Sequence, residues 1–289
     1  MCLYALKLLE ASKRLSLDKN LSERIREANV SLHQFEAKYY EQLHPEIYNR
    51  HEQKRLQSAL KMVDKLVAVT PLRAKKAFDV GAGTGNLTGK LLQMGYHVTA
   101  LDLSVEMCKI LEKKYQSYLQ SQKLVIVNSP IEDVSFDSGE FDLITCYSVL
   151  HHLPDYVDVV KRFSGFLKKG GVMYLDHEAS PFYWKNEATS VADVVKVVYF
   201  HSNPLLNALY FRVAGMKVPA LNYDMSDYWH NKEHPLDHEA IQRVFEEAHF
   251  DFFERTDYYV KFRTWVPNPL FYVYKRACGP EMSVWVAKK

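Results

Sequence analysis

The sequence predicts an α/β fold, a doubly wound and mostly parallel seven-stranded sheet with helices on both faces. From residue 76 onward short apolar runs alternate with amphipathic segments, which is the pattern of βαβ units around a parallel sheet. A glycine-rich loop at residues 81–85 follows the first apolar run and precedes the first amphipathic segment. Doubly wound sheets bind ligands at such strand-to-helix turns. The pattern therefore predicts both the fold class and the edge of the sheet at which function resides.

Composition narrows the class of protein further. Apolar residues make up 47% of the 289 residues, enough for a sizeable core. A net charge of +2 gives no case for nucleic-acid binding through bulk charge, and no apolar run reaches the roughly 18 residues of a membrane span. The cysteines are scattered, which argues against a disulfide framework or a zinc site and predicts a cytoplasmic location. They are Cys2, Cys108, Cys146 and Cys278.

The first 70 residues predict an N-terminal helical cap, and residues 71–289 predict the main domain. The first residues, apolar but without a basic leader, favour the start of an amphipathic helix over a secretory signal. A break is expected near residues 29–31. Apolar residues then recur at helical spacing between residues 52 and 69. We expect this helical material to lie over the carboxyl edge of the sheet.

The sheet itself is expected to begin at residue 76. Predicted strands cover residues 77–80, 97–101, 124–127, 141–146 and 172–177, with helices over 85–94, 104–119 and 155–167. The last of these helices is expected to end at Lys168-Lys169-Gly170-Gly171, because basic residues followed by glycine favour a helix C-terminus.

Residues from about 179 to 235 interrupt the alternation and predict a helical lid insertion rich in aromatic side chains. Loops of this length seldom lack structure or purpose. The aromatic residues either pack the insertion itself or line an apolar acceptor pocket. The remaining elements predicted are helices at 190–199, 237–249 and 269–275 and strands at 252–262 and 283–287.

The glycine loop reads Gly81-Ala-Gly83-Thr-Gly85, and Asp102 ends the second predicted strand. Glycine at these positions lets a ligand approach backbone N–H groups at a helix N-terminus. An acid after the second strand accepts hydrogen bonds from the hydroxyls of a bound ribose. Both features also have structural explanations, a tight turn and a helix cap, although Ser104 is the better cap. An NAD-binding domain would carry the same acid, but Asn86 stands where its third glycine belongs.

Four motifs in order resemble those of class I S-adenosylmethionine-dependent methyltransferases. They are Phe78-Asp79-Val-Gly81-Ala-Gly83-Thr-Gly85, Asp102-Leu-Ser104-Val-Glu-Met107, Phe141-Asp142-Leu-Ile-Thr-Cys146-Tyr-Ser148-Val-Leu150-His151-His152-Leu153 and Leu167-Lys-Lys-Gly170-Gly171. The resemblance is strong over residues 76–178 and loose from residue 236 to the end. It points to the small-molecule branches of the family, those of type 11 or 25 or the quinone methyltransferases, and implies an enzyme.

The resemblance implies a site for S-adenosyl-L-methionine. The loop from Gly81 to Gly85 would face the methionine part, Asp102 the ribose and Met107 one face of the adenine. Ser129-Pro130 replaces the acid usual in the adenine-binding turn, so Ile131 and Glu132 are expected to take over that contact. The full set implied for the cofactor is Tyr39, Asp79, Gly81, Ala82, Gly83, Gly85, Asn86, Asp102, Leu103, Met107, Ile131, Glu132, Cys146 and Tyr147.

Catalysis is expected to involve His152 first, then His151, with Tyr40 near the sulfonium. Side chains after the fourth strand face the ligand edge of the sheet, and imidazole titrates near neutral pH. An aromatic ring beside a sulfonium gains cation–π attraction. Packing and capping roles for both histidines, and a packing role for the Tyr39-Tyr40 pair, are left open. An activated acceptor would need no base.

The expected partner is a small, apolar or aromatic acceptor methylated at O, N or C. No metal, nucleic acid or integral membrane segment is expected, and a homodimer is left open. Two rival functions remain: a non-catalytic module that binds S-adenosylmethionine or another nucleoside, and an NAD-dependent oxidoreductase. The missing third glycine and an apparently antiparallel end of the sheet disfavour the oxidoreductase.

Overall fold

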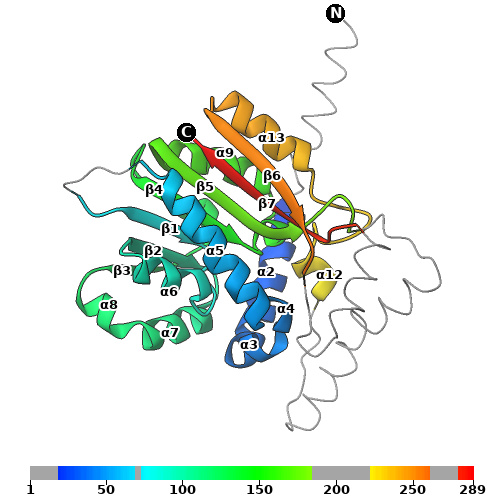
Figure 1. The fold of residues 1–289 in the computed structure, drawn as a ribbon. Helices are drawn as coiled ribbons and strands as arrows, with labels where there is room; N and C mark the ends of the chain where they lie inside the picture. The colour runs from blue at the N-terminus through cyan, green and yellow to red at the C-terminus, as the bar shows by residue number, and fades with distance from the viewer. Residues whose placement is uncertain (1–18, 69–72, 184–221, 261–278) are drawn as a thin grey trace, which may run out of the picture.

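In a computed structural model, the described residues 19–68, 73–183, 222–260 and 279–289 form one seven-stranded sheet with helices on both faces (Figure 1). The strand order is β3-β2-β1-β4-β5-β7-β6. The predicted fold class is therefore confirmed. The strands are β1 (Lys76–Val80), β2 (His97–Asp102), β3 (Leu124–Asn128), β4 (Phe141–Tyr147), β5 (Leu167–Ala179), β6 (Phe252–Tyr258) and β7 (Met282–Lys288).

The five strands β1 to β5 are parallel, and β7 runs antiparallel to both β5 and β6. The chain order reverses at β1, whose neighbours are β2 and β4. In doubly wound sheets this reversal opens a crevice at the carboxyl ends of the strands. The glycine loop that follows β1 lies at that crevice.

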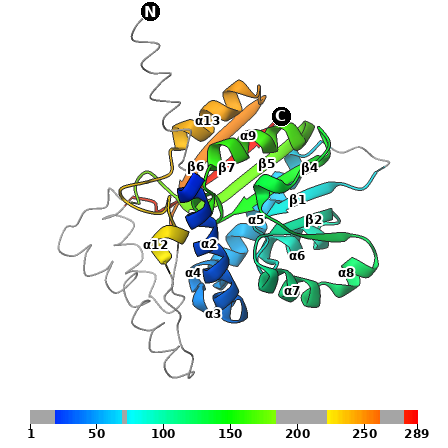
Figure 2. The same cartoon turned by 180° about the vertical axis from the view of Figure 1, so that it is seen from behind.

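Two apolar clusters cover the two faces of the sheet, because side chains on successive strand residues point to opposite faces. Helices α5 (Arg50–Leu66) and α6 (Asn86–Gln93) pack on one face, and α5 crosses the front of Figure 1. Helices α9 (Tyr156–Phe166) and α13 (His238–Glu247) pack on the other face, which Figure 2 turns toward the viewer. The sheet is thus a buried central layer.

The helix predicted over residues 104–119 is divided into α7 (Val105–Lys114) and α8 (Gln116–Gln120). Tyr115 leaves helical geometry, with φ −120° and ψ 28°, and its hydroxyl donates to the carbonyl of Gly85 at 3.0 Å. The phenol packs over the first turn of α6, where a Cβ on Gly89 would clash with it. Tyr115, at the point where the helix is divided, therefore supports the glycine loop through its side chain.

The helix predicted over residues 155–167 is confirmed as α9, which ends at Phe166, but residues 168–171 already belong to β5, so the predicted start of that strand at residue 172 was wrong. The pairing of Leu167 with Phe141 begins the strand early, and the N–H of Gly170 donates to the carbonyl of Lys289. Glycines at an irregularity between two neighbouring strands, here β4 and β5, give the same sequence signal as a helix C-terminus. The sequence alone therefore placed the start of the fifth strand too late.

The N-terminal helices lie beside the carboxyl ends of the parallel strands. Helix α2 (Lys19–Glu36) is continuous, so the expected break at residues 29–31 was wrong. The Asn29 amide caps no turn there, because it donates to the carbonyl of Ile25 at 2.9 Å within the helix. Short helices follow: η1 (Ala37–Tyr39), α3 (Tyr40–Leu43) and α4 (Pro45–Tyr48). Helix α12 (Tyr223–Ser226) lies against α2 (Figures 1 and 2).

Most of the predicted lid insertion and the helices predicted at 190–199 and 269–275 lie outside the described residues. The predicted division at residue 70 and the lid therefore stay predictions. Within the described part of the chain, no helix combines the length and the apolar character needed to cross a membrane.

Candidate cofactor and acceptor site

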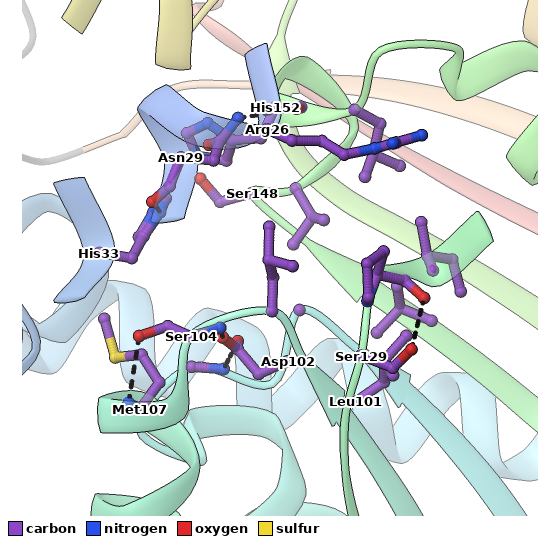
Figure 3. A pocket seen from close by; sticks show the side chains of 18 of the residues that line it. Arg26, Asn29, His33, Leu101, Asp102, Ser104, Met107, Ser129, Ser148 and His152 are labelled. Carbon is purple, nitrogen blue, oxygen red and sulfur yellow. Dashed lines mark hydrogen bonds between the residues drawn. The ribbon is translucent and has the colours of Figure 1, made fainter. Parts of the chain in front are cut away.

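A cavity opens at the carboxyl ends of the parallel strands, and its empty space, including the part open to solvent, is about 820 Å³. Its walls come from α2, the glycine loop, the ends of β2 and β3 and the turn after β4 (Figure 3). A smaller cavity of about 340 Å³ lies beside it and shares Tyr40, Gly81, Gly83 and Tyr147 as lining residues. The two cavities together form the candidate site.

The glycine loop needs residues without side chains for two different reasons. All three glycines have positive φ, with 64° at Gly81, 54° at Gly83 and 92° at Gly85, a region that other residues enter at a cost. A Cβ on Gly81 would lie 2.3 Å from Val149 Cγ2, whereas a Cβ on Gly83 would meet no protein atom within 4 Å. Gly81 therefore permits packing within the protein, and Gly83 keeps the cavity wall open to a ligand.

Asp102 ties the end of β2 to the glycine loop. Its Oδ2 accepts from the N–H of Gly83 at 2.7 Å, and its Oδ1 accepts from the N–H of Ser104 at 2.8 Å (Figure 3). Burial raises the pKa of the Asp102 carboxyl, and these N–H donors together with His33 oppose the rise. Ser104 also caps α7 by accepting from the N–H of Met107 at 3.4 Å. The carboxylate is thus fixed at the cavity wall.

Asp79 lies beneath the loop and is 2% exposed. The hydroxyls of Thr88 and Thr145 donate to it at 2.6 and 2.8 Å. Burial raises the pKa of this carboxyl to about 6, against the lowering effect of both hydroxyls. Because Asp79 lines the smaller cavity, it can orient the loop and also present an oxygen to a ligand.

The turn after β3 contributes Ser129, Pro130, Ile131 and Glu132 to the larger cavity. Arg162 supports this turn by donating to the Ile131 carbonyl at 3.1 Å. Glu132 is not free, because its carboxylate lies 3.5 Å from the guanidinium of Arg26 on α2. The expected adenine contacts therefore sit at the cavity, with Glu132 already engaged by an ion pair.

The turn after β4 carries η3 (Leu150–His152) and the two histidines. His152 lines the cavity, and its Nδ1–H donates to the carbonyl of Ser226 at 2.9 Å. His151 points away from the lining, and its Nδ1 lies 2.7 Å from the buried carboxylate of Glu178. Burial lowers the pKa of His151 to about 4 and that of His152 to about 3. Both imidazoles are therefore neutral at neutral pH.

Glu178 organises the whole turn after β4. Its Oε1 accepts from the N–H groups of Val149 and Leu150 at 2.9 and 2.8 Å, while its Oε2 faces His151. Burial raises the pKa of the Glu178 carboxyl, and the two N–H donors oppose that rise. One carboxylate from β5 thus fixes both the backbone and the first histidine of the turn.

Two tyrosines stand between the cavities. The ring of Tyr40 on α3 lies 4.2 Å from that of His44, centroid to centroid, and burial raises its pKa well above the usual value. Tyr147 at the end of β4 donates to the carboxylate of Glu52 at 2.9 Å and stacks on His177 at 4.9 Å. Both rings are placed to contact a ligand that extends through the two cavities.

Most residues predicted for the site line a cavity, but several do not. Tyr40, Asp79, Gly81, Ala82, Gly83, Asn86, Asp102, Leu103, Met107, Ile131, Glu132, Tyr147 and His152 line one or both. Gly85, Cys146, His151 and Tyr39 line neither. Gly85 is instead the N-cap residue of α6. Cys146 is fully buried, because its side chain points into the core between the sheet and α9.

Sequence reasoning missed three lining residues on α2. They are Arg26, Asn29 and His33, spaced so that they share one helix face. Asn29 donates to the carbonyl of His152 at 3.0 Å, and the His33 ring stands edge-on to the His152 ring at 5.0 Å. A polar row on an otherwise amphipathic helix was the available signal. The described aromatic residues of the insertion line neither cavity; Trp229, for example, donates to the Leu153 carbonyl at 2.8 Å.

Comparison with known proteins agrees with this geometry. Residues 78–175 match the family model described as a methyltransferase domain. The ubiquinone biosynthesis O-methyltransferase of Xanthomonas campestris pv. campestris is 31% identical over 114 residues, covering 39% of this chain and 47% of that protein. The enzyme of the same name from Vibrio parahaemolyticus is 32% identical over 104 residues, covering 36% and 43%. The chain thus spans about half the length of the curated relatives it matches.

Solved structures support the fold. The S-adenosylmethionine-dependent methyltransferase from Mesorhizobium loti aligns with a TM-score of 0.51 at 13% identity, covering 79% of this chain and 96% of that one. The CurJ carbon methyltransferase also aligns with a TM-score of 0.51, at 15% identity, covering 84% and 57%. Residues 78–175 therefore match a methyltransferase domain, and the chain has the fold of the S-adenosylmethionine-dependent methyltransferases.

Proposed function

We propose that the protein transfers a methyl group from S-adenosyl-L-methionine to a small acceptor. The observation that carries the proposal is the Asp102 carboxylate, held at the cavity wall by the N–H groups of Gly83 and Ser104. A carboxylate oxygen can accept more than one hydrogen bond. Asp102 therefore keeps acceptor capacity for the two hydroxyls of a ribose.

The remaining lining residues fit the other parts of this cofactor. Buried Met107 and Ile131 offer apolar surface to an adenine, and the open backbone at Gly83 admits the chain that leads to the sulfur. When bound, the cofactor supplies a methyl group on a sulfonium, which is already a strong electrophile. The protein has to orient the acceptor and exclude water from the reaction.

The acceptor side is formed by His33, Tyr40 and His152. Donation of the His152 Nδ1–H to the Ser226 carbonyl leaves the lone pair on Nε2. That nitrogen can hold an acceptor hydroxyl or remove its proton. Its pKa of about 3 makes it a weak base, so positioning by a hydrogen bond is the role that the burial of His152 favours, and a base role stays a prediction.

The remaining parts of the proposal concern the acceptor, the cellular location and the oligomeric state. The curated relatives are named as O-methyltransferases of ubiquinone biosynthesis, and the CurJ relative is named as a carbon methyltransferase. For this chain we propose the class of acceptor expected from the sequence, a small molecule with apolar or aromatic bulk. A cytoplasmic location and a homodimer stay predictions.

Cofactor binding tests the proposal directly. Isothermal titration with S-adenosylhomocysteine should show binding to the unaltered chain, and Asp102→Ala should weaken it by about 30- to 1000-fold, because a charge-assisted pair to the ribose is lost. Glu106→Ala is the matched control, since Glu106 is exposed on α7 and pairs with Lys109.

Equal affinity in the unaltered chain and the Asp102→Ala variant would refute the site. Binding without transfer of a labelled methyl group to any member of a broad acceptor panel would instead favour the non-catalytic module. Tight binding of NADH with no response to S-adenosylhomocysteine would favour the oxidoreductase.

A further inference from the structure

Three side chains with metal-ligand atoms converge behind the acceptor wall of the cavity. Among the described residues, His151, His152 and Asp227 each bring one such atom within 4.8 Å of the other two. The histidines come from η3, and Asp227 follows α12. Two segments that lie far apart in the sequence thus meet at this cluster.

The separation between His152 and Asp227 suits two ligands of one four-coordinate ion. The Nδ1 of His152 lies 3.3 Å from Oδ1 of Asp227, and tetrahedral bonds of about 2.0–2.2 Å to zinc place neighbouring ligand atoms about 3.3–3.6 Å apart. The Ser226 carbonyl oxygen lies at hydrogen-bond distance, 2.9 Å, from the same nitrogen. A small movement of this oxygen away from Nδ1 would bring it to the position of a fourth ligand.

His151 already has the support that metal-binding histidines usually have. Its Nδ1 faces the Glu178 carboxylate at 2.7 Å, and both side chains are buried. With the proton of His151 on Nδ1, the lone pair is on Nε2. A carboxylate behind a histidine fixes the tautomer and the ring orientation in metal sites. His151 lines neither cavity, so its Nε2 is not used by a ligand bound there.

We propose that His151 Nε2, His152 Nδ1 and the Asp227 carboxylate bind one divalent transition-metal ion, with the Ser226 carbonyl as the fourth ligand. Two imidazole nitrogens with two oxygens fit Zn²⁺ better than Mg²⁺ or Ca²⁺, which prefer all-oxygen sites. The ion joins η3 to the segment after α12. On binding, the His152 proton moves from Nδ1 to Nε2, so the charge of that imidazole is unchanged. In the metal-bound chain Nε2 therefore donates a hydrogen bond to the acceptor, and a base role for His152 is confined to the metal-free chain.

Metal content of the full, tag-free chain tests this proposal without any activity assay. After treatment with a chelator and dialysis against zinc sulfate, mass spectrometry of the metal should find about one zinc ion per chain. Asp227→Asn and His151→Gln should each lose it. Asp224→Asn is the matched control on α12, because Asp224 is exposed and offers no atom to the cluster.

Thermal unfolding gives a second readout. Zinc that binds only the folded chain should raise Tm by several degrees, and the rise should vanish in Asp227→Asn and persist in Asp224→Asn. If His151→Gln fails to fold, Asp227→Asn still decides, because the Asp227 side chain is 42% exposed and tolerates the change. Zinc content in Asp227→Asn equal to that of the unaltered chain would overturn the proposal and leave the methyl-transfer site unaffected.

Discussion

The two halves of the cavity are built in different ways. The cofactor half is local: Gly83 and Asp102, which share its central hydrogen bond, are 19 residues apart. The acceptor half is assembled over long distances: Asn29 bonds to His152 across 123 residues and to Ser226 across 197. The first half consists mostly of backbone and one acid, whereas the second consists of side chains from α2, η3 and the segment of α12.

This difference separates two kinds of mutational effect. Changes in the cofactor half should act on binding of the nucleoside, because the backbone N–H groups and Asp102 define that wall. Changes in the acceptor half should act on turnover and leave the nucleoside affinity nearly constant. Substitutions in each half therefore test whether the division is real.

The largest effect is expected in the acceptor half. If an acceptor hydroxyl or amine must lose a proton, His152→Ala should lower kcat by about 10²- to 10⁴-fold, while the affinity for S-adenosylhomocysteine stays within error. His151→Ala should lower kcat less, because His151 does not line the cavity. Single-turnover rates of both variants and of the unaltered chain decide the order, all measured on metal-free protein. A normal rate for His152→Ala from about pH 6 to about pH 9 would leave positioning alone to explain catalysis.

In the cofactor half, Gly83→Val should weaken binding of S-adenosylhomocysteine by at least about 30-fold, because the side chain would fill the open wall. Gly95→Val is a close control: Gly95 also has positive φ, at 87°, and also has no atom within 4 Å of an added Cβ. Both variants should lose a similar stability from backbone strain. Equal nucleoside affinities in these two variants, measured by titration calorimetry, would count against the assigned wall.

A smaller effect, on the free energy of unfolding, is expected from His44, whose ring lies against Tyr40 between the two cavities. Burial opposes the charged form of His44, but hydrogen bonds to Glu36 and Glu46 outweigh it and raise the pKa of His44 to about 10. A histidine with a raised pKa contributes stability that is complete below its unfolded pKa and is lost as pH rises through the folded value. The unaltered chain should therefore lose on the order of 2 kcal/mol between neutral pH and about pH 10.

The His44→Gln variant should show a flatter profile over the same window. Chemical denaturation at several pH values measures this, with His97→Gln as control because His97 is exposed at the start of β2. If the free energy of unfolding changes with pH in the same way in the unaltered chain and in His44→Gln, then His44 is not charged in the folded chain at neutral pH.

The sequence predicted most residues that line the cofactor half of the cavity, because that half depends on local rules. A glycine loop between a strand and a helix, followed by an acid after the next strand, specifies its own geometry through backbone sterics and one hydrogen-bond acceptor. The first five strands and their order follow from the same alternation. Gly81, Gly83 and Asp102 line the cavity as the sequence leads one to expect, and their contacts with a cofactor stay predictions.

The acceptor half could not be predicted in the same way. A helix break was expected near residues 29–31, but α2 continues through Asn29, whose amide donates to the carbonyls of Ile25 and His152. Glu178 gave no local signal of its role, since its partners lie in the turn after β4. Cys146 was expected to contact the cofactor because it lies near the end of β4. Side chains alternate between the two faces of a strand, and that of Cys146 points into the core.

Asn29 has a thermodynamic consequence for the order of events at the cavity. Its amide donates to the His152 carbonyl at 3.0 Å and its Oδ1 accepts from the Ser226 hydroxyl at 2.9 Å, so one residue of α2 fastens both η3 and α12. A ligand that favours the docked position of α2 also favours the docked position of α12. Cooperativity of this kind is reciprocal: whatever factor the nucleoside adds to acceptor affinity, the acceptor must return to the nucleoside. Asn29→Ala would remove both hydrogen bonds and should therefore weaken the coupling between the two events.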